Sequence, residues 1–349
     1  MYLGPVGLIC AVGLDAPSAC AAMRAGIAGF EELPYWDSDN LPVIGARVPG
    51  LSDDLQFGPR LVEMLAQALT DCLSTVSEFE LETLPLLVGL AEVGRPGGGG
   101  ALQHGIVAQV EKKLGVRFHA DLSAALPEGH TAGFAGLRLA RDLLRAHAVP
   151  ACVVCGVDSY INASSIYWLD RHWRLKRERH TDGVIPGEAA AAVLVLRQAP
   201  STLATCVEIA GLGYGLERAP VLSSEPLLGR GLASACSQAL REAGWGFHDL
   251  DFRITDMTGE NYGFREHVLA EGRLVRIVRS QAQPVWHAAD SIGDTGAAAG
   301  VVQLATGAAA LIKGYAPGPR VACFTSAVNG ARSVVALQRT NLFRGSHGV

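Results

Sequence analysis

Two short segments of the chain carry the residues best placed to do chemistry. Residues 129–133 (Gly-His-Thr-Ala-Gly) and residues 293–297 (Gly-Asp-Thr-Gly-Ala) are both small-residue turns that open an apolar helix. This similarity indicates an internal duplication, which puts His130 and Asp294 at equivalent helix starts. Unpaired backbone N–H groups and the positive end of the helix dipole converge at such positions. We therefore expect these two side chains to approach each other at the base of a pocket.

His130 allows two interpretations. A lone histidine at a buried helix start is often a packing residue that is held by a hydrogen bond. Alternatively, a carboxylate from Asp294, Asp256 or Glu260 pairs with the imidazole and supports acid–base chemistry or acyl transfer. A metal would need a third ligand, and no His-x-x-x-His or similar spacing supplies one. We predict neither a metal nor another cofactor.

The segments around these positions resemble a known family. Residues 291–300 (Ser-Ile-Gly-Asp-Thr-Gly-Ala-Ala-Ala-Gly) resemble the Asn-Ile-Gly-His-x-x-Gly-Ala-Ala-Gly signature of the β-ketoacyl synthases in the thiolase superfamily. Residues 182–190 are similar to the family's Asp-Gly-Phe-x-x-Gly-Glu-Gly-Ala block, and residues 7–13 with 24–26 to its first strand and helix. The resemblance implies a thiolase-like α/β fold with five layers, αβαβα. It also implies two pseudo-symmetric halves, 1–200 and 201–349, that form one intertwined unit.

The catalytic residues of the family are not retained. Matching its motifs onto this chain puts His130 in place of the nucleophilic Cys and Asp294 in place of one catalytic His. The nearest match to the other His is Asp256, and the segment 327–330 lacks the family's gating Phe. A ketosynthase needs a thiolate to carry the acyl chain, and donors rather than a carboxylate to stabilise an enolate. The substitutions therefore argue against ordinary ketosynthase chemistry. The residues that the resemblance puts around the old substrate pocket are Thr131, Thr258, Gly293, Thr295, Val328 and Asn329.

The composition fits a large α/β core. The chain has 349 residues, of which 49% are hydrophobic, and 41 glycines. A net charge of −5 argues against nucleic-acid binding. The N-terminus lacks the basic region of a signal peptide, and no apolar run approaches a membrane span, so we predict a cytoplasmic protein without membrane insertion. We expect reduced thiols, with Cys152 and Cys155 buried on one face of a strand.

The periodicity predicts comparable elements in the two halves. Helices are expected at residues 59–73 and 231–244, and the strands that follow them at 84–90 and 252–257. The halves are predicted to join within residues 198–202. The resemblance implies that the strand after the first central helix, here residues 151–157, lies at a dimer edge, and its lack of charge would favour pairing there. We therefore predict a twofold dimer across it, either with a second copy or with an active homologue.

The strongest concentration of charge lies in residues 170–180. One interpretation is a solvated surface segment. The other is a docking face for an acidic partner, as acyl carrier protein is for the resembled family. Trp and Arg are favoured at interface hot spots, which supports docking. The candidate docking residues are Trp168, Arg171, Trp173, Arg174, Lys176, Arg177 and Arg179.

Three functions agree with these observations. The first is a non-catalytic ketosynthase-like subunit that binds a partner, as chain-length-factor-type subunits do. Short degenerate proteins of this kind also resemble those encoded beside spike and adaptor genes of bacterial type VI secretion systems, where the partner is an adaptor or effector. The second is an acyltransferase or hydrolase that uses His130 with Asp294. The third is a protein that binds an acyl chain or acyl carrier.

Overall fold

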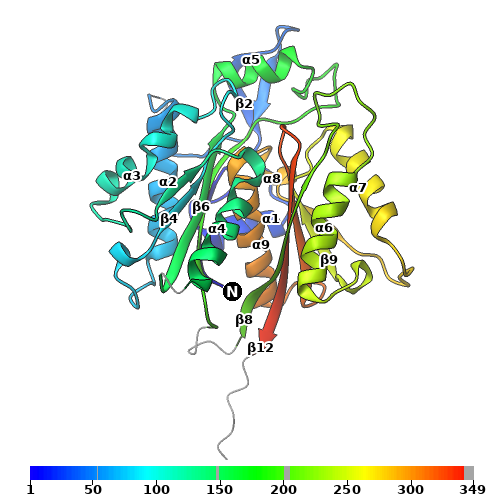
Figure 1. Cartoon of the computed structure of the whole chain (residues 1–349). Helices are drawn as coiled ribbons and strands as arrows, with labels where there is room; N and C mark the ends of the chain where they lie inside the picture. Colours follow the sequence, from blue (N-terminus) through cyan, green and yellow to red (C-terminus); the bar gives the residue numbers. More distant parts are fainter. Residues whose placement is uncertain (53, 147–148, 200–204, 342–349) are drawn as a thin grey trace, which may run out of the picture.

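The sheet of this protein repeats one strand pattern twice. The computed structural model describes residues 1–52, 54–146, 149–199 and 205–341. Within these residues a 10-stranded sheet divides into two matching halves (Figure 1). The first half has the order β1 (Tyr2–Cys10), β7 (Glu188–Leu196), β6 (Ala151–Ser159), β4 (Leu86–Gly89) and β5 (Ala124–Leu126). The second half has the equivalent order β8 (Thr205–Leu216), β12 (Ala331–Asn341), β11 (Arg320–Ser326), β9 (Phe252–Thr255) and β10 (Val285–His287).

Helices cover both halves of the sheet and fill the space between them, which gives the five predicted layers (Figure 1). The outer helices are α2 (Phe57–Leu73) and α3 (Ile106–Leu114) on one side and α6 (Arg230–Ala243) and α7 (Asn261–Leu274) on the other. The central layer holds α1 (Ala16–Arg24), α4 (Ala132–Arg145) and α9 (Ala299–Lys313), with the short α8 (Ala289–Ile292). The sheet halves meet where β1 pairs with β8 at Tyr2 and Leu3. The predicted α/β architecture with five layers is confirmed.

The periodic segments form the elements that their spacing predicts. Helices α2 and α6 begin and end within two residues of the predicted ranges 59–73 and 231–244. Strands β4 and β9 lie inside the ranges 84–90 and 252–257 and are shorter than predicted. The predicted join at 198–202 falls largely on residues 200–204, which lie outside the described residues. The division into halves at residue 200 therefore stays a prediction.

The two central helices α4 and α9 contact each other directly. A Cβ added to Gly133 would lie 2.7 Å from Cγ2 of Val301, and one added to Gly300 would lie 3.2 Å from the ring of Phe134. A side chain at either glycine would push the helices apart, because distances this short leave no room for it. The duplication predicts this adjacency, and it brings the two helix starts together.

The predicted dimer edge is wrong. Strand β6 lies inside the sheet, between the antiparallel β7 and the parallel β4. Its residues 151–157 lack charge because sheet neighbours and helices cover them completely, not because they wait for another copy. In the described residues the edge of this half is the short β5, and no dimer across β6 is possible in this fold.

The interpretation of the two strand cysteines also needs correction. Both are fully buried, but Cys152 belongs to the apolar cluster of the central layer and Cys155 to the cluster under α2. Successive residues of a strand point to opposite faces, so positions three apart lie on opposite faces rather than one. The expected role in the core is confirmed, and the shared face is not.

A small cap lies beyond one end of the five layers (Figure 1). It contains the hairpin β2 (Glu31–Trp36) and β3 (Pro42–Gly45) and the helix α5 (Ala163–Arg171). A separate apolar cluster that includes Leu33, Val43 and Leu169 holds the hairpin against the helix. The cap therefore presents the charged segment 170–180 at the end of the molecule.

The expectation that no apolar run approaches a membrane span is wrong, because one helical stretch among the described residues is long and apolar enough to cross a membrane. This stretch is Gly296–Lys313, and 78% of it is buried inside the protein. It forms the turn before α9 and α9 itself, so its apolar composition reflects its place in the central layer.

Candidate active site

His130 and Asp294 are fixed by the turns that precede the two central helices. A single 3₁₀ turn, Gly129–Thr131, leads into α4, and Gly129 has a φ of 59° that favours glycine. Asp294 precedes the equivalent turn Gly296–Ala298, which leads into α9. Its backbone N–H donates to the carbonyl of Ile185 at 2.8 Å, which ties the segment to the loop before β7. The duplicated turns therefore place the two side chains at adjacent helix starts.

The two side chains form a buried ion pair. His130 Nε2 lies 2.8 Å from Asp294 Oδ1, and the residues are only 5% and 4% exposed. Burial disfavours the imidazolium, but the charge and hydrogen bond of Asp294 outweigh it and raise the pKa of His130 to about 9. Burial also disfavours the carboxylate, but His130 and the backbone N–H of Gly296 lower the pKa of Asp294 to about 2. Both groups are therefore charged at neutral pH.

Asp256 lies near the pair without bonding to it. Its Oδ2 accepts the backbone N–H of Ser326 at 2.6 Å, and the side chain lines the same cavity as His130. Burial raises the pKa of Asp256 to about 6, although the charge of His130 opposes the shift. Glu260, the other candidate, binds elsewhere: both its oxygens accept from Arg174 at 2.7 Å. Of the three carboxylates considered for His130, Asp294 is its partner.

The cavity beside the pair is small. It has a volume of about 50 Å³, which suffices for a few water molecules. Of the predicted pocket residues, Thr258 and Val328 line it. Gly293 and Thr295 line a neighbouring cavity of about 10 Å³. Thr131 lines neither and donates its hydroxyl to the carbonyl of Glu128, so its predicted pocket position is wrong. Asn329, also predicted there, is instead exposed in the turn between β11 and β12.

Two further buried ion pairs surround the site and were not predicted. Arg332 Nε lies 2.8 Å from Glu266 Oε1, and both residues line the cavity. Arg95 pairs with Asp158, whose Oδ2 also accepts the backbone N–H of Ala297 at 2.8 Å. Asp158 thus satisfies a free N–H at the start of the second central helix. A carboxylate that directly follows the apolar run of β6 is the sequence signal that points to it.

The described residues do not offer a metal site. No group of three or more His, Cys, Asp or Glu side chains among them is arranged to hold an ion.

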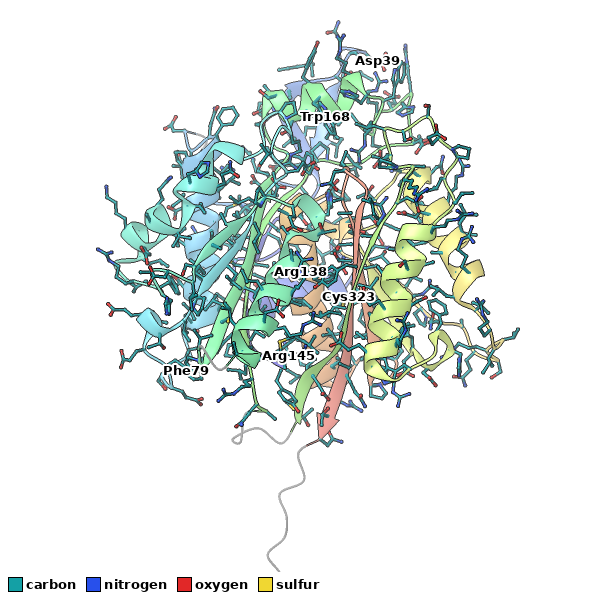
Figure 2. All side chains as sticks on the ribbon, in the orientation of Figure 1. Asp39, Phe79, Arg138, Arg145, Trp168 and Cys323 are labelled. Carbon is teal, nitrogen blue, oxygen red and sulfur yellow. The ribbon has the colours of Figure 1, made fainter. Side chains whose placement is uncertain are left out.

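The charged segment of the cap is divided between the interior and the surface. Arg174 is buried in its ion pair with Glu260, and Arg177 is buried against Asp39 and Asp170 at 3.4 and 3.3 Å. The expectation that these two arginines face a partner is therefore wrong, because their charges are neutralised inside the protein. Figure 2 shows Asp39 and Trp168 together at this end of the molecule. Trp168 is half-buried, whereas the residues left exposed are Arg171, Trp173, Lys176 and Arg179.

Comparisons with known proteins identify the fold. No protein-family model matches the sequence, and no curated protein matches it. The ketosynthase domain OzmH KS7 (oxazolomycin, Streptomyces albus JA3453) has a TM-score of 0.77 at 16% identity, over 97% of this chain and 75% of that chain. The ketosynthase ApeO in complex with its chain length factor ApeC, from Xenorhabdus doucetiae, has a TM-score of 0.70 at 15% identity. The match covers 97% of this chain and 98% of that chain. An AntDE:AntF complex, a type II PKS acyl-carrier protein with its ketosynthase, has a TM-score of 0.78 at 13% identity. The match covers 97% of this chain and 98% of that chain.

These similarities extend over nearly the whole chain and agree with the duplicated strand order and the paired helix starts. The chain therefore has the thiolase-like fold of ketosynthases and chain length factors.

Proposed function

We propose that the protein is a non-catalytic ketosynthase-like subunit that acts by binding a partner protein. The observation that carries the proposal is the His130–Asp294 ion pair, at the helix start where the resemblance puts a nucleophilic Cys. With a pKa of about 9, His130 is protonated at neutral pH and has no lone pair with which to attack a thioester. Its Nδ1 is buried and has no hydrogen-bond partner among the described residues, so no second group activates the ring.

The thiols of the chain do not replace the missing nucleophile. All eight cysteines are buried, and burial raises the pKa of each thiol above its ordinary value. The thiolate is the reactive form, so these side chains are inert at neutral pH. None of them lines the cavity beside His130.

The size of the cavity also supports a non-catalytic role. Small-molecule sites usually enclose about 300 to 1,000 Å³. The cavity of about 50 Å³ at His130 is too small for an acyl chain. The bidentate Arg174–Glu260 pair lines its wall.

The exposed part of the cap segment supports a partner of opposite charge. Arg171, Lys176 and Arg179 are exposed, against the one exposed acid Glu178 among residues 171–179, on a chain whose net charge is −5. Trp173 stands among them, 67% exposed. Its backbone has a φ of 56°, which is rare for a bulky residue, and the Arg177 guanidinium lies 4.9 Å from its ring. Trp173 combines an unusual backbone conformation with an exposed ring that contacts Arg177, and such a tryptophan is suited to anchor an interface.

Two kinds of partner fit this proposal. The first is a ketosynthase-like subunit in a homodimer or heterodimer, and the ApeO complex with its chain length factor shows that this fold forms such pairs. The second is an acidic protein at the cap: an acyl carrier, as in the AntDE:AntF complex, or an adaptor or effector of type VI secretion. All these roles place the protein in the cytoplasm.

The test combines assembly with chemistry. The full chain is mixed with the ketosynthase and acyl carrier encoded nearest to it, and complexes are detected by native mass spectrometry. We expect a complex with the acyl carrier that the double variant Trp173→Ala, Lys176→Glu weakens. The control Arg265→Glu changes an exposed arginine on α7 and should leave this complex unchanged. In parallel, malonyl and acyl carrier thioesters are offered to the protein, and intact mass is measured.

We expect no acyl-enzyme from the wild type. An acyl adduct or condensation product that disappears in His130→Ala would overturn the non-catalytic role and favour the acyltransferase or hydrolase. Retention of an acyl chain without covalent attachment or partner binding would favour the acyl-binding protein instead.

A further inference from the structure

A second and larger cavity lies between helices of the central layer and an edge of the sheet. It has a volume of about 490 Å³, within the usual range for small-molecule sites. Helices α1 and α9 and the edge strand β10 form its walls, and it shares no lining residue with the cavity at His130. This cavity plays no part in the function proposed above.

Aromatic rings form one wall of this cavity. Trp286 of β10 packs on Phe252, with ring centroids 4.6 Å apart, which fixes the orientation of the indole from the core side. Tyr315 lies just beyond α9 with its ring nearly parallel to the indole, at 21° and a centroid distance of 6.3 Å. Both rings line the cavity. Rigid aromatic faces at a cavity wall favour a flat, apolar group.

Arg24 is a cation at the rim that has no acidic partner in the described part of the chain. Arg24, in the last turn of α1, lies over the ring of Tyr315, with its guanidinium carbon 4.2 Å from the ring centroid. Its guanidinium makes no hydrogen bond or ion pair to any residue that the structure describes. Stacking leaves the N–H edges of the guanidinium open, and these edges match a carboxylate or a phosphate.

The remaining polar residues limit the charge of a ligand. Asp290 also lines the cavity and is exposed, so it would repel a ligand with more than one negative charge. His287 Nδ1 lies 2.9 Å from Thr255 Oγ1, and burial lowers the pKa of His287, so this imidazole contributes hydrogen bonding rather than charge. A monoanion suits this combination better than a phosphate dianion.

We propose that this cavity binds a flat aromatic carboxylate, with the ring against Trp286 and the carboxylate on Arg24. The aromatic wall supplies apolar burial, and the stacked guanidinium supplies the charge-assisted hydrogen bonds. Gly26 lies at the mouth, and a Cβ added there would meet no atom within 4 Å, so the cavity opens directly to solvent.

Isothermal titration calorimetry on the full chain tests this proposal with 2-naphthoate and its neutral isostere 2-naphthamide. We expect one equivalent of naphthoate to bind, and naphthamide to bind about tenfold more weakly. Arg24→Gln should weaken naphthoate binding by about tenfold and abolish the preference for it over naphthamide. Arg265→Gln removes an exposed arginine elsewhere and should change neither affinity.

Trp286→Leu should remove binding of both compounds, and its thermal unfolding shows whether the variant is folded. Arg24 lies at the surface, so we expect Arg24→Gln to fold. This variant tests the proposal even if Trp286→Leu does not fold. The proposal is overturned if the wild type binds no naphthoate at millimolar concentration. It is also overturned if naphthamide binds equally well, or if Arg24→Gln retains the preference for the anion.

Discussion

Replacing Asp294 with asparagine keeps the shape of the side chain but removes the charge that holds His130 protonated. The pKa of His130 is raised from 6.5 to about 9 in the folded protein. Each pKa unit corresponds to about 1.4 kcal/mol, so this difference contributes about 3 kcal/mol to the free energy of unfolding. Because the folded pKa is the higher one, the contribution is complete below pH 6.5 and is lost as the pH rises through 9.

The assay is urea unfolding of wild type and Asp294→Asn at pH 6 and pH 10, followed by tryptophan fluorescence. We expect the variant to be less stable by about 3 kcal/mol at pH 6 and by much less at pH 10. Groups that titrate equally in both proteins cancel in the difference. Asp121→Asn makes the same change at an exposed carboxylate and should cost less than about 0.5 kcal/mol at either pH.

Two results would refute this reasoning. A loss of the same size at both pH values would mean that Asp294 contributes packing or hydrogen bonding but does not charge His130. A loss below about 1 kcal/mol at pH 6 would mean that the protonation of His130 does not depend on the Asp294 carboxylate. His130 could then be neutral and nucleophilic in the wild type.

Three further predictions concern the core. No cysteine should react with a thiol reagent in the native protein at pH 7.5, and all eight should react in denaturant, because every thiol is buried. Glu188→Gln should lower the free energy of unfolding by about 3 to 5 kcal/mol in urea titrations, because it leaves the buried Arg60 without its charge partner. Gly213→Ala should abolish soluble expression or lower the melting temperature strongly, since its Cβ would lie 1.8 Å from the carbonyl oxygen of Ala235. The same change at Gly272, whose Cβ would meet nothing within 4 Å, should be neutral or stabilising by up to about 1 kcal/mol.

Much of the fold could be predicted because it depends on patterns that repeat along the chain. The duplicated turns predict that His130 and Asp294 meet, and the structure places their nitrogen and oxygen 2.8 Å apart. The helical periodicity gives α2 and α6 to within two residues. Such patterns are local, so they survive without knowledge of tertiary contacts.

The errors arise where one local pattern fits two environments. An uncharged Val-rich sequence is compatible with a strand at the edge of a sheet and with one in its interior. The pairing of β6 with both β4 and β7 shows that this strand is interior. Arg174 lies in a charged segment typical of a solvated surface. Its burial depends on Glu260, which is 86 positions away in the sequence, and periodicity carries no information on such a pair.

The pairing of the first strand has a consequence for how the protein is made. β1 is synthesised before both of its sheet partners: Tyr2 pairs with Leu196 and Glu208, so the strand stays unpaired until β7 has been translated. Helix α4 packs on β4 and β6 with one face, and its other face stays uncovered until α9, which begins at Ala299, has been made. A ribosome-bound chain therefore leaves the backbone edges of β1 unpaired until β7 has been made, and the α9-facing side of α4 uncovered until α9 has been made. A chain that stops before residue 299 has no helix to complete the central layer, and such products should aggregate or depend on chaperones.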